Sequence, residues 1–255
     1  MKSIIAVINQ KGGVGKSTTA AAIAAGLTLT GYKVLAVDLD AQCNLTYTMG
    51  GRSDGATVLG VLLREAKAAA AIQHTDTGDL IAASKSLAGA DAYLNDTGKE
   101  YRLREAIETI SADYDYIVID TPPALGILTV NALTAATSVI IPAQADVFSF
   151  QGIEQLGNTI EPVKRYYNRD LKITGVLITR YNNRAALSRE MRELIERLAA
   201  RLGTTLFSTT IREAIAVKEA QVNQKSLFSY APKAKVTDDY RAFIDELMER
   251  EAKGK

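Results

Sequence analysis

A short glycine-rich segment carries the residue types best suited to chemistry in this chain. It reads NQKGGVGKST, follows the β-branched run Ile4–Ile8 and opens a segment with a helical pattern. Glycines let the backbone curl so that its N–H groups point inward, and the positive end of a helix adds to the attraction for an anion. In such a loop Lys16 reaches the β- and γ-phosphates of a nucleotide and the Ser17 hydroxyl ligates Mg²⁺. The segment therefore predicts a phosphate cradle.

The cradle departs from the usual pattern G-x-x-x-x-G-K-[ST] at one position. Gln10 stands where the first glycine belongs, and a lysine, Lys11, follows it. The alternative is a solvent-exposed glycine-rich turn with two lysines, but the coincidence of a strand, glycines, a Lys-Ser pair and a helix start disfavours it. The residues predicted to hold the phosphates are Lys11, Gly12, Gly13, Val14, Gly15, Lys16, Ser17 and Thr18.

Three aspartates stand at the ends of predicted strands. Asp38 and Asp40 belong to VDLDAQCN, and Asp120 ends the run YIVID. The carboxyl edge of a parallel sheet is where ligands bind in such folds, and an aspartate after four apolar residues is typical of a strand that supplies a Mg²⁺ ligand. The alternatives are a helix cap for Asp38 or Asp40 and a turn-initiating residue for Asp120.

The elements that position these residues follow from the pattern of apolar runs. Several runs are continuously apolar, which suits parallel strands covered on both faces, and helix-length segments separate them. This alternation predicts an α/β fold with a doubly wound, mostly parallel sheet flanked by helices. The predicted strands are Ile4–Ile8, Val34–Asp38, Tyr116–Asp120, Ser138–Pro142 and Ile173–Thr179, with weaker candidates at Leu80–Ala83 and Thr205–Ser208.

Two helices are predicted with defined bounds. Lys16–Thr30 is rich in alanine and ends before Gly31, a plausible glycine stop, and Ser188–Arg201 has apolar residues at helical spacing. Residues 50–96 have the weakest pattern and are expected to hold loops with short helices. The length of 255 residues favours one domain over residues 1–255.

Composition excludes several classes of site. Charged residues make up 23% of the chain and its formal net charge is +1, as in ordinary globular proteins. A single cysteine, Cys43, excludes an internal disulfide, and a single histidine, His74, disfavours a histidine-based metal site or relay. We expect a packing role for Cys43 and an exposed position for His74. No apolar run is long enough to span a bilayer, so a cytoplasmic location is expected.

The segment KGGVGKS resembles the deviant Walker A motif of the ParA/MinD group of P-loop ATPases. This resemblance implies ATP and Mg²⁺ as cofactors and a homodimer that sandwiches nucleotide. It also implies that Lys11 is the signature lysine, which reaches the phosphates bound by the partner copy. A second cation there is physically sensible, because it offsets charge developing on the transferred phosphoryl group.

The aspartate segments carry the same resemblance. VDLDAQCN is similar to the family pattern D-x-D-P-Q-G-N, with Ala41 in place of proline and Cys43 in place of glycine. By resemblance, Asp40 orients the attacking water and Asp38 helps to organise the Mg²⁺ shell. YIVIDTPPALGILTVNAL resembles the second switch segment of the family, which gives Asp120 a place near the metal.

The C-terminal third also resembles ParA. The segment TIREAIAVKEAQ is similar to the ParA segment that covers the adenine ring, and by resemblance Arg212 stacks on the base. Ala214 stands where family members often have asparagine, which removes one side-chain hydrogen bond. The resemblance covers nearly the whole chain except roughly residues 50–110. It is closest to Soj-like partition ATPases without an N-terminal DNA-binding domain.

A basic block gives a second indication of function. Residues 161–235 contain 15 basic and 7 acidic residues, a composition that attracts polyanions, although a solvated surface is the alternative. ParA-like proteins bind double-stranded DNA without sequence preference, through salt-sensitive phosphate contacts. The candidate DNA contacts are Arg184, Arg189, Lys218, Lys225, Lys233, Lys235 and Arg241.

These features favour a nucleoid-associated DNA-partition ATPase, for a plasmid or chromosome, whose slow hydrolysis is stimulated by a ParB-like partner. The alternative is a MinD-like or orphan ParA-like ATPase that positions a membrane-associated or protein cargo. Residues 236–255 hold four basic and six acidic residues, so core packing explains their apolar stripe better than membrane binding does. An iron–sulfur enzyme needs more cysteines, and a small-molecule ligase leaves the basic block unexplained.

Overall fold

The computed structural model describes residues 3–182 and 186–253. In this part of the chain, eight strands form one sheet in the order β3-β4-β2-β5-β1-β6-β7-β8. Neighbouring strands run parallel except for β3 and β4 at one edge. The strands are β1 (Ser3–Val7), β2 (Val34–Asp38), β3 (Ile72–Thr75), β4 (Gly78–Ile81), β5 (Tyr116–Asp120), β6 (Ser138–Gln144), β7 (Lys172–Thr179) and β8 (Leu206–Thr210).

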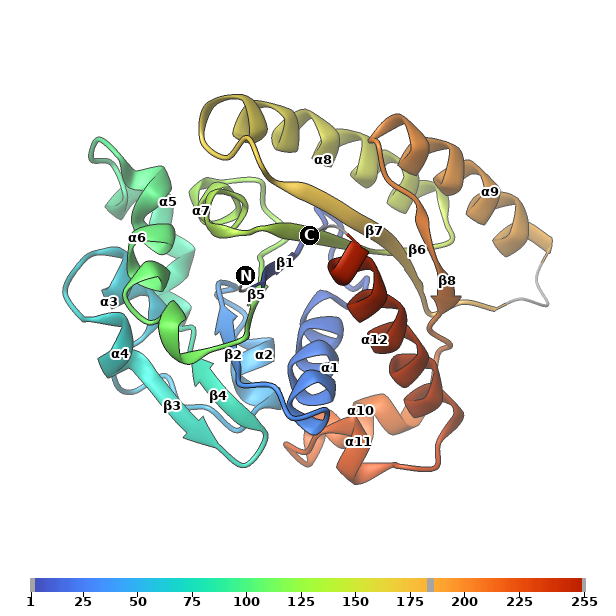
Figure 1. Cartoon of the computed structure of the whole chain (residues 1–255), viewed down its shortest axis with the longest axis horizontal. Helices are drawn as coiled ribbons and strands as arrows, with labels where there is room; N and C mark the ends of the chain where they lie inside the picture. Colours follow the sequence, from blue (N-terminus) through green and yellow to red (C-terminus); the bar gives the residue numbers. More distant parts are fainter. Residues whose placement is uncertain (1–2, 183–185, 254–255) are drawn as a thin grey trace.

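Helices cover both faces of the sheet (Figure 1). The layer against one face comprises α3 (Val58–Leu62), α4 (Ala68–Ala71), α5 (Ala90–Tyr93), α6 (Arg102–Glu108), α7 (Ile127–Ala135), α8 (Val147–Tyr166) and α9 (Ala186–Arg201). The layer against the other face comprises α1 (Lys16–Leu29), α2 (Asn44–Thr48), α10 (Ile215–Val222), α11 (Leu227–Tyr230) and α12 (Lys235–Lys253). The predicted doubly wound α/β fold is confirmed.

The two-sided cover explains why the strands are continuously apolar. All five residues of β5 are buried, and successive side chains alternate between two hydrophobic clusters. Ile117 and Ile119 belong to the cluster under α7 and α8, whereas Val118 packs on the side of α1 and α12. A strand with water on one face would need polar residues at alternate positions.

The parallel arrangement brings the chemically interesting residues to one edge. In the register of the sheet, Val7, which precedes the glycine-rich loop, aligns with Asp120, and Asp120 aligns with Asp38. The loops that follow β1, β2 and β5 therefore emerge side by side. This edge lies where open α/β sheets bind ligands.

The region with the weakest pattern differs most from the prediction. Residues 50–96 contain short helices, as expected, but also the antiparallel hairpin of β3 and β4. The predicted strand Leu80–Ala83 lies two residues too late, and β3 was not predicted. This edge strand, IQHT, carries no buried residue, so it lacks the apolar pattern that signals a strand. By contrast, Val34–Asp38 and Tyr116–Asp120 were predicted with the observed bounds.

The C-terminal helix α12 belongs to the core. Its apolar stripe packs near α1 and β8, and the four side chains are at most 3% exposed. The prediction of core packing is confirmed for these residues, which are Tyr240, Phe243, Ile244 and Leu247. Within residues 3–182 and 186–253, no helix is both long and apolar enough to cross a membrane.

Candidate functional site

The glycine-rich loop turns directly into the first turn of α1. Gly13 and Gly15 have positive φ angles of 75° and 88°, which glycine adopts without strain. No side chain caps the N-terminus of α1, and its first turn contains no acidic residue. The first N–H groups of the helix are therefore left for an anion, which the helix dipole also attracts.

Side chains from distant strands hold this loop in shape. The Asn9 amide donates to the Pro142 carbonyl at 2.7 Å and accepts from the Lys11 N–H at 2.9 Å. The Thr179 hydroxyl, at the end of β7, donates to the Val14 carbonyl at 2.8 Å. Because these contacts fix the backbone before any ligand arrives, the loop is preorganised for phosphate.

Lys16 is the buried cation of the site. Only 6% of the residue is exposed, and its ammonium donates to the Lys11 carbonyl at 3.1 Å. Burial lowers the pKa of this amine, and the carboxylates of Asp120 and Asp40 oppose the shift. A desolvated ammonium without a direct ion pair among the described residues gains strongly from the negative charge of a polyphosphate.

The second lysine of the loop is held away from Lys16. The Lys11 ammonium forms an ion pair with Asp146, donates to the Gln144 side chain at 3.3 Å and lies 5.8 Å from the centre of the Phe148 ring. Asp146 also accepts from the Ser149 N–H at the start of α8. Burial alone would raise the pKa of Asp146, but the bonds from Lys11 and Ser149 hold it below its usual value.

Asp38 uses both carboxylate oxygens to order the segment after β2. One oxygen accepts from the Asp40 N–H at 3.0 Å, and the other accepts from the N–H and hydroxyl of Thr46 at 2.8 and 2.7 Å. Burial raises its pKa to about 6 even though these bonds favour the charged form. The structure therefore gives Asp38 the role of an anchor for α2, next to the site.

Asp120 has the opposite surroundings. It is fully buried, and neither carboxylate oxygen accepts a hydrogen bond of ordinary length and angle from the described residues. Burial, reinforced by Asp38, raises its pKa well above the usual value, while Ser17 and Lys16 oppose the rise. Orphaned buried oxygens are costly unless a cation joins them. Asp120 and the nearby Ser17 hydroxyl suit Mg²⁺.

The metal site is not complete without a ligand. No group of three or more His, Cys, Asp or Glu side chains is arranged for a metal within the described part of the chain. Mg²⁺ commonly binds through one or two protein groups, water and substrate phosphates. The two candidate ligands Ser17 and Asp120, with Asp38 behind them, fit this mode of binding better than a site in which protein side chains supply every ligand.

Asp40 lies closer to the opening of the site than Asp38 does. It accepts from the Gln42 N–H at 3.0 Å and lines the same cavity as Gly12 and Lys16. Cys43 follows with a left-handed φ of 56°, a conformation that explains the family's glycine at this position. Burial raises the pKa of the Cys43 thiol, which agrees with a packing role rather than a nucleophilic one.

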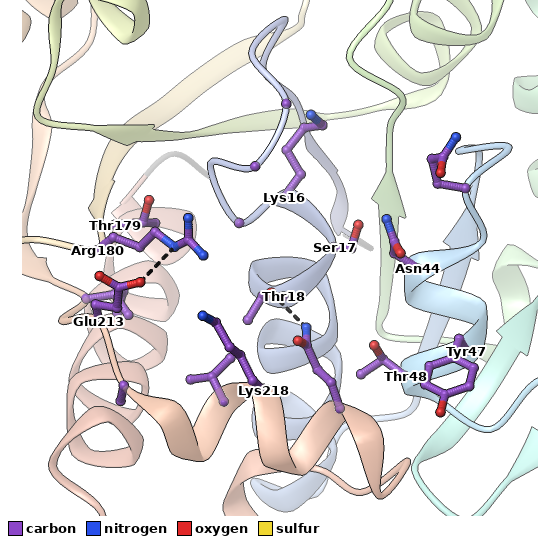
Figure 2. Close-up of a pocket in the computed structure, with 18 of the residues that line it drawn as sticks. Lys16, Ser17, Thr18, Asn44, Tyr47, Thr48, Thr179, Arg180, Glu213 and Lys218 are labelled. Carbon is purple, nitrogen blue, oxygen red and sulfur yellow. Dashed lines mark hydrogen bonds and ion pairs between the residues drawn. The ribbon is translucent and has the colours of Figure 1, made fainter.

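A cavity of about 580 Å³ joins the loop to the C-terminal third of the chain (Figure 2). Lys16 and Thr18 lie along one wall, and α10 closes the opposite side, where Gln221 donates to the Thr18 hydroxyl at 3.0 Å. Arg212, predicted to stack on adenine, lines the cavity and forms a bidentate ion pair with Asp239. Six of the eight predicted cradle residues therefore share one cavity with Arg212, whereas Lys11 and Val14 do not line it.

The candidate DNA contacts do not form one patch. Arg184 lies outside the described residues. Arg189 is on α9, against the opposite face of the sheet from α10 and α12. Lys218 projects into the cavity in Figure 2 and lines it. The remaining four are exposed and lie between the end of α10 and the middle of α12; they are Lys225, Lys233, Lys235 and Arg241.

Sequence reasoning missed several residues that shape the site. Gln144 donates to the Gly13 carbonyl at 3.2 Å, Asp146 pairs with Lys11, and Thr179 holds Val14. All three stand at or just after the carboxyl ends of predicted strands. Polar residues at those positions were the available signal, because parallel strands place them at one edge.

Comparisons with known proteins agree over nearly the whole length. A family model described as an AAA domain matches residues 2–173. The chain is 36% identical over 253 residues to the chromosome partitioning protein ParA of Myxococcus xanthus, covering 97% of this chain and 88% of that protein. It is 38% identical over 252 residues to the sporulation initiation inhibitor protein Soj of Bacillus subtilis, covering 97% and 98%.

A solved structure of similar shape carries a different name. Cobyrinic acid a,c-diamide synthase from Mycobacterium smegmatis, with bound ADP and magnesium, superposes with a TM-score of 0.86 at 37% identity. The match covers 100% of this chain and 97% of that one. The same protein has also been solved with an ATP analogue and magnesium.

Proposed function

The chain belongs to the ParA/Soj family of P-loop ATPases, and from this premise we propose that it is an ATP-driven DNA-partition ATPase. ATP and Mg²⁺ are its cofactors, as the ligands of the similar M. smegmatis structures suggest. The observation that carries the proposal is the joint placement of Lys16 and the orphaned carboxylate of Asp120 beside an uncapped helix start.

The residues of the site have distinct tasks in the proposed reaction. The N–H groups at the start of α1 and the Lys16 ammonium bind the β- and γ-phosphates. Mg²⁺, when bound, supplies positive charge to the phosphate oxygens, and Ser17 and Asp120 hold it. Asp40 positions the attacking water. The site contains no strong base, so we expect slow hydrolysis that a ParB-like partner stimulates.

A second copy of the chain completes the proposed site. Phe148 beside Lys11, and Tyr47 and Val222 at the cavity lining, are large apolar side chains that are each more than half exposed. Apolar surface around a charged cavity marks an interaction face. In an ATP-bound homodimer, Lys11 leaves Asp146 and meets the phosphates held by the partner copy.

The dimer then binds nonspecific DNA in the proposed cycle, at the nucleoid in the cytoplasm. Lys225, Lys233, Lys235 and Arg241 supply an exposed basic strip for phosphate contacts. Arg241 also pairs with Asp238, and that pair is weak because both side chains are exposed. The buried stripe of α12 is engaged in the core, which favours a DNA surface over the membrane surface of a MinD-like cargo system.

The test of hydrolysis is the pair Asp40→Ala and Asp113→Ala. Asp40→Ala should retain Mg-ATP binding and an ATP-dependent dimer but lose at least about 100-fold in hydrolysis rate, as the loss of a positioned catalytic group does. Asp113 is exposed and remote from the cavity, so Asp113→Ala should behave as the unsubstituted protein does. Normal turnover by Asp40→Ala would contradict the role of Asp40.

The test of DNA binding uses two charge-matched double variants. Replacing Lys233 and Lys235 by alanine should weaken retention on mixed-sequence duplex in ATP and flatten its salt dependence by roughly one to two units of slope. The control replaces Lys67 and Arg104, which are exposed, belong to the layer of α4 and α6 and do not line the cavity. Retention that is insensitive to salt, or equal losses in both variants, would contradict a DNA role for this strip.

A second candidate function is ATP-dependent amide formation on a small carboxylic acid. It is favoured by the name of the M. smegmatis structure, to which the chain is as similar as it is to ParA. The two functions differ in what accelerates ATP turnover. Stimulation by DNA with a partner protein supports partition, whereas stimulation by a carboxylic acid together with a nitrogen donor supports amide formation.

A further inference from the structure

The order of the strands determines which end of the cavity receives the nucleobase. β2 and β5, which carry Asp38 and Asp120, lie on one side of β1, whereas β6, β7 and β8 lie on the other. The carboxylates and the metal attend the γ-phosphate, so the triphosphate tail points toward β5 and β2. The base must therefore extend toward the ends of β7 and β8. This step rests on the function proposed above.

Two backbone hydrogen bonds hold the wall at that end together. The Ile211 N–H donates to the Ile178 carbonyl, and the Tyr181 N–H donates to the Ile211 carbonyl, each at 2.9 Å. These bonds fasten the residues after β8 to the end of β7. As a result Arg180, which lies between Ile178 and Tyr181, comes close to Glu213, which follows Ile211 by two positions. Both residues belong to the cavity wall.

Arg180 and Glu213 form a loose ion pair in this wall. The Arg180 Nε lies 3.8 Å from a Glu213 carboxylate oxygen, and both residues line the cavity, as Figure 2 shows. At that distance the contact is an ion pair without a direct hydrogen bond. A carboxylate accepts at about four lone-pair sites, so Glu213 retains the capacity to accept from a ligand.

The backbone of Arg180 supports a specialised role for this pair. Its φ of 49° is left-handed, a conformation that is unfavourable for a non-glycine residue. Thr179, immediately before it, is tied to the phosphate loop through Val14. The strained residue is thus fixed to the cradle at one side and paired with Glu213 at the other. Strain of this kind concentrates at ligand sites.

The side chains next to Glu213 offer no competing hydrogen-bond acceptor. Ala214 has no polar side-chain atom, and the Arg212 guanidinium is engaged by Asp239 on α12. Lys218 is a cation and cannot accept a hydrogen bond. Among the residues from 212 to 218 that line the cavity, Glu213 is the one whose side chain can accept a hydrogen bond from the amino group of adenine.

We propose that Glu213 selects adenine nucleotides by accepting a hydrogen bond from the exocyclic amino group of the base, with Arg180 as the residue that positions its carboxylate. A purine without this amino group offers Glu213 no donor at that position. The pair thus recognises one substituent of the base, its exocyclic amino group, whereas the cradle binds any triphosphate.

The test compares three ligands with Mg²⁺ in equilibrium binding measurements. They are ATP, purine riboside triphosphate, which lacks the amino group, and inorganic tripolyphosphate, which lacks the whole nucleoside. The unsubstituted protein should prefer ATP over purine riboside triphosphate by about tenfold, the loss expected for one hydrogen bond to a charged group. Glu213→Ala should reduce this preference to less than about twofold and leave tripolyphosphate binding unchanged.

Three further variants distinguish recognition of the base from a purely structural role. Glu219→Ala removes an exposed glutamate of α10 outside the cavity lining and should keep the tenfold preference. Arg180→Ala should lower the preference to about threefold, and Arg180→Lys should restore most of it because the cation returns.

The outcomes distinguish this proposal from the one on which it rests. If the unsubstituted protein binds neither ATP nor tripolyphosphate, the ATPase function fails. If it binds ATP but Glu213→Ala keeps the tenfold preference, the ATPase function stands and the role of Glu213 is wrong. Equal losses for ATP, purine riboside triphosphate and tripolyphosphate would also overturn the role, because they indicate damage to the cradle.

Discussion

The two ends of the cavity are built on different physical principles. At the phosphate end, Lys16, Asp38 and Asp120 are buried, and hydrogen bonds from the side chains of Asn9 and Thr179 hold the phosphate loop in shape. At the base end, the side chains of Arg180 and Glu213 are 45% and 62% exposed and meet through one loose ion pair. The first end strengthens electrostatic interactions by excluding water, whereas the second leaves them screened.

The phosphate end therefore supplies most of the binding free energy, and the base end supplies selectivity among ligands. Buried charges with too few partners destabilise the nucleotide-free protein and are relieved when phosphate and metal arrive. Exposed charges cost little in either state and modulate the choice among ligands that already bind. Substitutions should therefore have large effects on binding at the phosphate end and small, ligand-specific effects at the base end.

The largest expected effect is that of Lys16→Ala. This change removes the buried ammonium that meets the β- and γ-phosphates, and it leaves Asp120 and Asp40 without their nearby cation. We expect ATP affinity to fall by at least about 100-fold, and tripolyphosphate affinity by the same factor. Isothermal titration with both ligands measures this. A loss confined to ATP would break the comparison, because it would place part of base recognition at the cradle.

The second effect is a gain of stability from Asp120→Asn. The raised pKa of this carboxyl means that its ionisation opposes folding, so the neutral amide should stabilise the nucleotide-free protein by about 2 kcal/mol at pH 8. The gain depends on pH because the pKa of the Asp120 carboxyl is higher in the folded protein than in the unfolded one. The cost of ionising this carboxyl in the folded protein is therefore absent below about pH 4 and grows as pH rises. Urea unfolding at pH 4 and pH 8 measures both values.

The same variant should lose the response to ligand. Mg-ATP should raise the unfolding temperature of the unsubstituted protein, and Asp120→Asn should abolish the magnesium-dependent part of that rise. Asp113→Asn, at an exposed site, is the matched control. A stable variant that still responds fully to magnesium would show that Asp120 is a structural acid and not part of the metal site.

How far the sequence predicts each end follows from the distance between interacting residues along the chain. Eight adjacent residues specify the cradle, and Asp38 meets Thr46 only eight positions away, so local patterns suffice. The Lys11–Asp146 contact joins residues 135 positions apart, and Arg180 meets Glu213 only because β7 pairs with β8. Such contacts depend on sheet order, which no local pattern contains.

The directions of the side chains in the basic block of residues 161–235 also depend on packing that the sequence does not reveal. Lys218 was expected on a DNA surface, and the structure places it in the cavity lining, because α10 turns one face inward. Its charge was visible in the sequence, but the direction of its side chain depends on how α10 packs against α2 and α11. Strand β3 escaped prediction for a related reason: its neighbour β4, rather than its own composition, makes it a strand.

A smaller effect is expected from Asp146→Asn, which separates two tasks of one residue. Asparagine caps helices as well as aspartate does, so α8 should keep its start, while Lys11 loses its ionic partner. If Lys11 must leave this pair to meet a second copy, the variant should dimerise with Mg-ATP at roughly fivefold lower protein concentration. Sedimentation in an Asp40→Ala background measures this, and unchanged or weaker dimerisation would contradict a restraining role for Asp146.

The smallest effect is expected from Arg212→Ala. Although Arg212 lines the cavity and was predicted to stack on adenine, its guanidinium is anchored to Asp239, and about half of its side chain is exposed. Removing it eliminates a partly screened ion pair and one face of contact, so ATP affinity should change by less than about threefold. Tripolyphosphate affinity should not change. A tenfold loss for ATP alone would restore Arg212 as the principal contact of the base, and would mean that stacking, rather than the carboxylate of Glu213, dominates this end of the cavity.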